Sequence, residues 1–275
     1  MRAHNRRGFS LVELLVTLVV TAVVGTALTN LLVKQQRFFN RQEGMSNARA
    51  VSRGALNMVF SEMRMLEQTG GIWYAWSNLI GIRAPFAIGV VCATSSASTT
   101  VALLPMDSVM YATSGITGYA WRDADGNYTY DDWGVGRTEV TAAACAGESI
   151  TAPPGGRYVT LTPGAAAAPI GAPFFLTHHV IYWFGASTSV PGGRALYRYD
   201  YGGYTYEEVV APFDNTARFR FFVNDGATAQ DAVPASYDMI TGLELVLTST
   251  NEFGAPGDRE KQYTTTAVFF KNRID

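Results

Sequence analysis

A run of oxygen-bearing side chains between residues 123 and 131 has spacing suited to a calcium site. Asp123, Asp125, Asn127 and Asp131 occupy relative positions 1, 3, 5 and 9. Calcium accepts six to eight oxygen ligands, so these side chains could converge on one ion. The run departs from an EF-hand loop because Tyr128 replaces the usual glycine at position six and no glutamate stands at position twelve. The alternative interpretation is an Asx-rich β-turn between two aromatic strands.

Other candidate residues do not combine into a catalytic site. His178 and His179 are adjacent in an expected strand, so their side chains face opposite sides of the sheet and cannot share a metal without distortion. The third histidine, His4, lies near the N-terminus. The sequence has no Gly-x-Ser-x-Gly, no His-Glu-x-x-His and no P-loop. We therefore expect a protein that is not an enzyme and has no cofactor, apart from calcium if the acidic run binds it.

Two groups of aromatic residues could form a platform for a sugar or a protein. They are Trp73, Tyr74 and Trp76, and Tyr197, Tyr199, Tyr201, Tyr204 and Tyr206. Tyrosines that alternate along strands also serve in cross-strand packing, which is the alternative interpretation.

The element that precedes all of these residues is an apolar segment at the N-terminus. Residues 11–33 are nearly all Leu, Val, Ala, Thr or Gly, and Glu13 is the only charged residue among them. This length suffices for a transmembrane helix, which needs about 20 residues, and exceeds the apolar core of a secretory signal peptide. Arg2, Arg6 and Arg7 precede it, so the positive-inside rule places residues 1–8 in the cytoplasm and the rest of the chain outside.

The order Arg6-Arg7-Gly8-Phe9, then Glu13 within the apolar run, resembles the class III signal of type IV prepilins and type II secretion pseudopilins. The resemblance implies that a prepilin peptidase cleaves between Gly8 and Phe9, and that Phe9 becomes N-methylated. It also implies that Glu13 pairs with the N-terminal amine of a neighbouring subunit during assembly. The alternative for Glu13 is that its carboxylate snorkels to the cytoplasmic interface.

The helix is expected to continue beyond the membrane. Ala48, Val51, Ala55, Val59, Met63 and Leu66 recur at intervals of three and four residues, which is typical of one face of an amphipathic helix. Gly70-Gly71 would end it. We therefore expect a leader at 1–8, a helix at 9–70 and a head at 71–275. Within the helix, residues 9–33 would form the membrane or filament-core part, and residues 34–70 the amphipathic part.

The head is expected to be rich in antiparallel strands, which makes the fold class α+β. Expected strands include 86–92 paired with 99–104, two aromatic strands around the acidic run, and 157–162. The C-terminal part would add strands at 174–184, 195–200, 204–210, 216–223, 240–248 and 263–271, separated by Gly, Pro or Asp turns. Residues 85–170 as a whole match no pattern of known function.

Cys92 and Cys145 would both lie outside the membrane, in an oxidising compartment. A disulfide between them is plausible there, and two unpaired buried thiols are the alternative. Removing the leader's three arginines leaves 18 basic against 23 acidic residues, a net charge of −5. No basic footprint for nucleic acid is evident.

The order of the C-terminal strands narrows the resemblance to PilW-type minor pilins and the related J-type minor pseudopilins. The segments that carry it include Ile181-Tyr182-Trp183, Phe219-Arg220-Phe221-Phe222 and a closing Phe269-Phe270-Lys271. The resemblance implies a subunit of the bacterial inner membrane with a periplasmic head, which enters a pilus or pseudopilus. Its partners would be major and minor pilins, the prepilin peptidase and the pilus assembly machinery. A membrane-anchored module that binds sugar, DNA or calcium is the alternative of another class.

Overall fold

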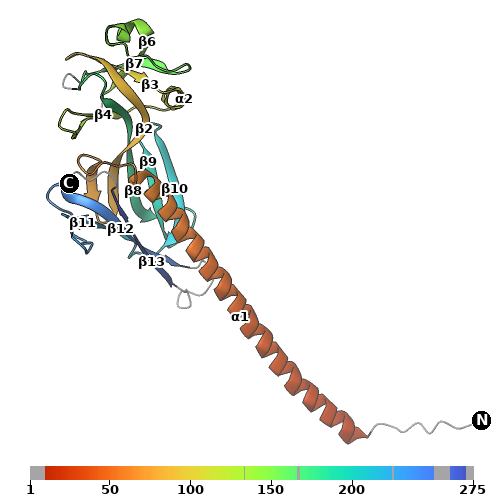
Figure 1. Ribbon diagram of the computed structural model, residues 1–275. Helices are drawn as coiled ribbons and strands as arrows, with labels where there is room; N and C mark the ends of the chain where they lie inside the picture. The colour runs from red at the N-terminus through yellow and green to blue at the C-terminus, as the bar shows by residue number, and fades with distance from the viewer. Residues whose placement is uncertain (1–9, 133, 166–167, 225, 251–260, 271–275) are drawn as a thin grey trace, which may run out of the picture.

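The computed structural model shows one long helix joined to a head built on an antiparallel sheet (Figure 1). It describes residues 10–132, 134–165, 168–224, 226–250 and 261–270. The helix, α1 (Leu11–Met63), has 53 residues and is therefore about 80 Å long at 1.5 Å per residue. Its residues 11–43 are all exposed, and only its last turns pack on the head. The architecture confirms the α+β class predicted from the sequence.

The helix ends earlier than the sequence predicts. It was expected to reach Gly70, but its last helical residue is Met63. The chain then tightens into turns in which the Met65 and Leu66 N–H groups donate to carbonyls three residues back. This bend turns the Leu66 side chain into the core, where it is 1% exposed. The apolar spacing that suggested continued helix is thus satisfied by a buried turn.

The thirteen strands within the described residues of the head belong to one sheet, and every pair of neighbours is antiparallel. They are β1 (Ile72–Trp76), β2 (Leu79–Thr94), β3 (Thr99–Leu103), β4 (Gly118–Arg122), β5 (Tyr128–Asp132), β6 (Gly136–Val140), β7 (Arg157–Thr162), β8 (Pro173–Ala186), β9 (Arg194–Asp200), β10 (Thr205–Phe213), β11 (Arg218–Val223), β12 (Ile240–Thr250) and β13 (Lys261–Phe269). A short helix, α2 (Pro105–Thr113), follows β3. The main path of the sheet runs β11-β12-β10-β9-β8-β2-β3-β7-β6.

The head has two apolar cores, and the long pair β2–β8 runs through both. In the proximal lobe, α1 lies against β10, β12 and β13, and Val59 and Met63 are fully buried with Phe184 and Leu245. In the distal lobe, which carries β3, β4, β6, β7 and α2 at the far end of the head in Figure 1, the core gathers around Tyr119 and Phe174. The β2–β8 register extends from Leu79 opposite Trp183 to Val90 opposite Pro173. One ladder, with a register shift between Pro85 and Ala87, therefore joins the two lobes.

Candidate functional site

The N-terminal signal lies at the free end of α1. Gly8 and Phe9 fall outside the described residues, so the predicted cleavage site stays a prediction. Glu13 stands in the first turn of the helix and is exposed. The first four N–H groups of a helix have no intrahelical acceptor, and a negative charge is favoured beside them. The Glu13 carboxylate thus stands at the exposed end of the helix, on a segment that buries no residue against the described part of the head.

The apolar segment of α1 has the surface of a membrane-spanning helix. Its best 18-residue window has a mean hydropathy of 2.3, none of that window is buried, and it is the only such helix in the part of the chain that the structure describes. The hydroxyl groups of Thr17, Thr21 and Thr29 donate to carbonyls of the preceding turn at 2.7–2.9 Å. Polar groups in lipid must be satisfied internally. These threonines therefore add little polarity to the outside of the helix.

The other end of α1 is locked to the head by polar contacts as well as by the apolar seam. Glu62 accepts hydrogen bonds from Arg198 of β9, at 2.8 Å from Nη2 and 3.2 Å from Nε. About three to four turns earlier in α1, the Ala48 carbonyl accepts a hydrogen bond from the Ser249 hydroxyl of β12 at 2.9 Å, and the Ser52 hydroxyl lies 3.1 Å from the same Ser249 oxygen. The Glu62 and Arg198 side chains are only 19% and 14% exposed. The C-terminal end of α1 is therefore fixed in one orientation on the head.

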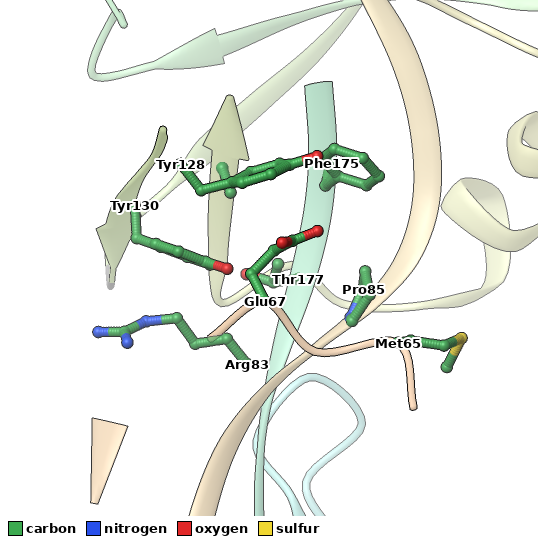
Figure 2. Close-up of a pocket in the computed structure, with 9 residues that line it drawn as sticks. Met65, Glu67, Arg83, Pro85, Tyr128, Tyr130, Phe175 and Thr177 are labelled. Carbon is green, nitrogen blue, oxygen red and sulfur yellow. The ribbon is translucent and has the colours of Figure 1, made fainter. Parts of the chain in front are cut away.

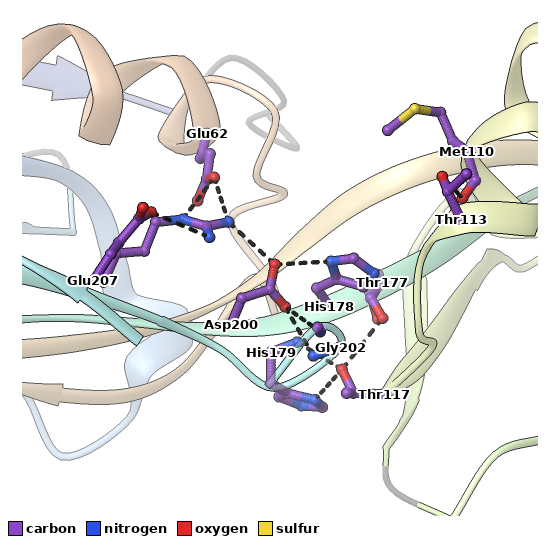
Figure 3. A network of polar contacts seen from close by, with 12 residues as sticks. Glu62, Met110, Thr113, Thr117, Thr177, His178, His179, Asp200, Gly202 and Glu207 are labelled. Atoms are coloured by element: carbon purple, nitrogen blue, oxygen red, sulfur yellow. Dashed lines mark hydrogen bonds and ion pairs between the residues drawn. The ribbon is translucent and has the colours of Figure 1, made fainter. Parts of the chain in front are cut away.

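A chain of polar contacts continues from this pair toward the distal lobe (Figure 3). Arg198 Nη2 lies 3.4 Å from Oδ2 of Asp200, and that oxygen lies 3.2 Å from Nδ1 of His178. The Gly202 N–H donates to the other carboxylate oxygen of Asp200 at 2.8 Å. Burial alone would raise the pKa of Asp200, but the contacts with His178, Gly202 and Arg198 outweigh it and lower the pKa to about 2.

His178 and His179 face opposite sides of the sheet, as the sequence predicts. His178 packs on Phe86 with ring centroids 4.1 Å apart and reaches Asp200. On the other face, His179 Nδ1 lies 2.8 Å from the Thr117 hydroxyl and Nε2 lies 3.1 Å from Asp132. Each ring approaches a different carboxylate, so the two rings do not converge on one site.

Asp132 is the meeting point of three segments. Arg83 Nε donates to both of its carboxylate oxygens, at 2.9 and 3.0 Å, and His179 approaches the same group. Burial opposes ionisation, but these hydrogen bonds and charges hold the pKa of Asp132 far below its ordinary value. Arg83 also donates to the Gly70 carbonyl. No local pattern predicted this junction, because its residues are far apart along the chain.

Cys92 of β2 and Cys145 form a disulfide, with their Cα atoms 5.3 Å apart. Cys145 belongs to the short 3-10 helix Ala142–Glu148. The bridge ties this segment to the distal lobe, where both cysteines are 1% exposed. The sequence-based pairing is thus present in the structure, and none of the described cysteines is unpaired.

The acidic run is built as a turn. Asp123 Oδ1 accepts the N–H groups of Asp125 and Asn127, at 3.0 and 2.8 Å, which closes the hairpin between β4 and β5. Asp131 instead accepts a hydrogen bond from the Tyr119 hydroxyl at 2.9 Å, on the body of the hairpin. Among the described residues, no group of three or more His, Cys, Asp or Glu side chains is placed to hold a metal. The Asx turn is therefore present in the structure, and the calcium site stays a prediction.

The two aromatic groups meet on one face of the sheet. Trp73 and Tyr201 are 6.3 Å apart between ring centroids, and Trp183, Tyr197 and Tyr206 stack across β8, β9 and β10 at 5.1 and 5.4 Å. Tyr197 is 2% exposed, so its ring packs against its neighbours and is closed to a ligand. Packing accounts for the centre of this face, and exposed rings remain at its rim.

Comparison with known proteins is informative at one end of the chain. Residues 3–29 match the family model described as the prokaryotic N-terminal methylation motif. The match covers Gly8, Phe9, Glu13 and most of the apolar run, and it ends before the head begins. Comparisons with curated proteins and with solved structures found no match. The matched residues 11–29 therefore lie in the part of α1 in which every residue is exposed.

Proposed function

The chain carries the N-terminal signal of the type IV pilin-like family, and on this premise we propose that it is a minor pilin that helps to initiate pilus assembly. The observation that carries the proposal is the methylation motif at the free end of a helix whose residues 11–43 are exposed. An apolar helix that is exposed beside the described part of its own chain suits a subunit that moves from a membrane into a bundle of similar helices. The role is structural and not enzymatic.

In this proposal the subunit waits in the bacterial inner membrane with residues 1–8 in the cytoplasm and the head in the periplasm. The prepilin peptidase cuts between Gly8 and Phe9, and Phe9 is N-methylated. Glu13 then pairs with the N-terminal amine of a neighbouring subunit, since an ionised carboxylate in an apolar bundle requires a partner. The head docks on other minor pilins in a tip complex that serves motility, adhesion or DNA uptake. A minor pseudopilin of a type II secretion system is the alternative.

The first experiment is mass spectrometry of the N-terminal peptide from membranes of cells with and without the prepilin peptidase. We expect a chain that begins at methylated Phe9 only where the peptidase is present. An uncut N-terminus in both strains would refute the proposal, because an ordinary signal anchor would explain the apolar helix. Capture of partner proteins would then distinguish a pilus from a secretion system.

The assembly role of Glu13 needs a separate test. The Glu13→Ala variant should remain membrane-bound and be cleaved. It should enter filaments poorly, because the N-terminal amine of the neighbouring subunit then has no carboxylate to pair with. Glu43→Ala is the matched control, since Glu43 is also an exposed glutamate of α1 but lies outside the apolar segment. Equal filament incorporation of both variants would remove the proposed role of Glu13.

A membrane-anchored binding module is a second candidate, favoured by the aromatic face. Tyr206 at its rim is 60% exposed and Tyr204 is 80% exposed, as a sugar platform would require. This candidate predicts that the full chain in detergent binds oligosaccharide and loses that binding in the double variant Tyr204→Ala, Tyr206→Ala. It takes precedence if the N-terminus is never cleaved.

A further inference from the structure

The charged groups of the pocket where the end of α1 meets the β4–β5 hairpin are paired within the chain. Figure 2 shows the Glu67 side chain beside Tyr128, and the Tyr128 hydroxyl donates to the Glu67 carboxylate. Arg83 Nε donates to both carboxylate oxygens of Asp132. Polar groups that are open to a partner lie instead along an edge of the sheet, where a strand has a neighbour on one side and none on the other.

The strand β13 is such an edge strand of the proximal lobe (Figure 1), and β12 is its one partner strand among the described residues. The Phe270 N–H donates to the Thr241 carbonyl at 3.2 Å, which fixes the phase of the hydrogen bonds along this ladder. In an antiparallel pair, every second residue exchanges both of its hydrogen bonds with the partner strand. The N–H and C=O groups of Thr265, Ala267 and Phe269 therefore point away from β12.

These outward groups are open to solvent as well as unpaired. Thr265, Ala267 and Phe269 are all exposed, and Phe269 is 50% exposed. Within the part of the chain that the structure describes, none of the three makes a backbone hydrogen bond outside the ladder with β12. Each residue carries one donor and one acceptor. A row of alternating donors and acceptors thus repeats about every 7 Å, the length of two residues of strand.

Several other edges of the sheet have features that prevent edge-to-edge pairing. The strand β6 has only five residues and carries the exposed charges of Arg137 and Glu139. The outer edge of β11 is bridged by Gln230, whose N–H and C=O both bond to Phe221, and β10 has two register shifts. In contrast, β13 has nine residues, and residues 262–269 include no charged residue, proline or glycine. The edge of β13 therefore lacks these safeguards.

An extended polypeptide matches this row, because its backbone repeats the complementary donors and acceptors at the same spacing. The residues that present the row are a threonine, an alanine and a phenylalanine, so the complementary strand is uncharged. Phe269 packs on Phe222 with ring centroids 4.7 Å apart, and its exposed half offers an apolar contact at one end of the row. Backbone hydrogen bonds would supply the affinity, and alternate side chains the specificity.

Two other occupants fit the edge less well. Residues 251–260, which join β12 to β13, contain a proline, two glycines and four charged residues, and this composition disfavours a strand. A second copy would pair its own β13 antiparallel, about a two-fold axis perpendicular to the sheet. Because α1 packs along the sheet, that axis would reverse its direction. The two copies would then not be anchored in one membrane with the same orientation, an argument that rests on the proposed function.

We propose that β13 is a docking edge, on which a partner protein adds an extended, uncharged strand to the sheet of the head. The probe is an acetylated and amidated peptide with the sequence Lys-Thr-Val-Thr-Val-Thr-Val-Lys. The full chain in detergent micelles is mixed with this peptide, and hydrogen exchange is followed by NMR at each amide. Saturating peptide should slow the exchange of the Thr265, Ala267 and Phe269 amides at least tenfold, because each outward group gains a hydrogen bond.

A control peptide separates backbone pairing from other contacts. It has proline at two adjacent central positions, so it lacks a donor on each of its two edges and resists an extended ladder. This peptide should leave the exchange of the three outward amides unchanged. The Val268 amide points toward β12 and should exchange slowly with or without either peptide.

Two variants test the edge from the side of the protein. Ala267→Lys adds a charge of the kind that blocks pairing at natural edges, and Ala267→Pro removes one outward N–H without removing a bond to β12. Each should weaken peptide binding at least tenfold. Ala112→Lys is the matched control, because Ala112 is also an exposed alanine but lies on α2, and it should bind like the wild type. A thermal melt shows which variants are folded, and either folded variant of Ala267 decides.

Unchanged exchange of the three amides at saturating peptide would overturn the proposal, as would equal protection by the proline peptide or wild-type binding by a folded Ala267 variant. Slow exchange without peptide that is lost on dilution would assign the edge to a second copy. Slow exchange at every dilution would assign it to another part of this chain, and either result would also overturn the proposal. None of these readouts depends on cleavage between Gly8 and Phe9, so failure of the pilin proposal and failure of this one are separately visible.

Discussion

The two halves of α1 share one secondary structure but have opposite surroundings. Residues 11–43 bury no side chain, whereas residues 44–63 place Ala48, Ala55, Val59 and Met63 among the buried residues of the head. Helices gain most of their stability from packing an apolar face. The first half packs against none of the described residues of the head. The head therefore fixes one end of α1, and under the proposed function the other end is the part that enters a bundle of subunits.

The largest expected effect comes from removing the Glu62–Arg198 hydrogen bonds, which join the second half of α1 to the head. Glu62→Ala leaves Arg198 largely buried without its main partner, and we expect a loss of about 3 kcal/mol in the free energy of unfolding. Denaturant unfolding of the full chain in detergent measures it. Glu43→Ala, on the exposed half, should change the free energy by less than about 0.5 kcal/mol. Similar values for both variants would show that these hydrogen bonds add nothing to packing.

A second test replaces one alanine by leucine in each half of α1. Ala55 is fully buried against the sheet, so Ala55→Leu should overpack the seam and cost about 1–3 kcal/mol. Ala27 is exposed on the apolar half, and Ala27→Leu should leave the stability of the head unchanged. The measurement is the melting temperature followed by near-UV circular dichroism. A loss with Ala27→Leu would mean that the first half also packs on the head.

This contrast between the halves was visible in the sequence, because it depends on local periodicity. The spacing of Ala48, Ala55, Val59 and Met63 predicted the buried face, and most strands of the head were predicted from alternation and turn residues. The predicted end of the helix was wrong. Leu66 continues the helical spacing of apolar residues, but its side chain is buried by the turn that follows Met63.

Some elements of the distal lobe were missed although they carry local signals. Pro105 at the start of α2 and Asp107 in its first turn are typical of a helix N-terminus. The strand β6 of the same lobe and the strand β1, which packs in the proximal core, were also missed.

The charge network could not be predicted from local patterns at all. Arg83 and Asp132 are 49 positions apart in the sequence, and His179 approaches Asp132 from β8. Only the pairing of β8 with β2 and β4 brings these segments together. A single sequence contains no periodicity that encodes such long-range contacts.

The network at the end of α1 makes the head sensitive to acid in a way that the exposed half is not. The pKa of Asp200 is lowered to about 2 in the folded state, against an ordinary value of 3.8. A lowered pKa contributes stability that is present above the ordinary value and is lost as pH falls through the folded value. The free energy of unfolding should therefore drop between pH 4 and 2. Asp200→Asn should flatten that drop, and an unchanged slope would mean that other carboxylates cause it.

The smallest expected effect comes from replacing a glycine by alanine, which α1 should tolerate at Gly54 and the head should not tolerate at Gly70. Gly54 is exposed within the helix and a Cβ atom there would meet nothing within 4 Å. Gly54→Ala should therefore stabilise the protein by about 0.5–1 kcal/mol, because alanine loses less backbone entropy in a helix. Gly70 has φ +77° and touches the Tyr130 ring, so Gly70→Ala should destabilise it. A lower melting temperature with Gly54→Ala would show that the helix needs a flexible residue near its contacts with the head. The conclusion that the head holds this end of α1 rigidly would then be wrong.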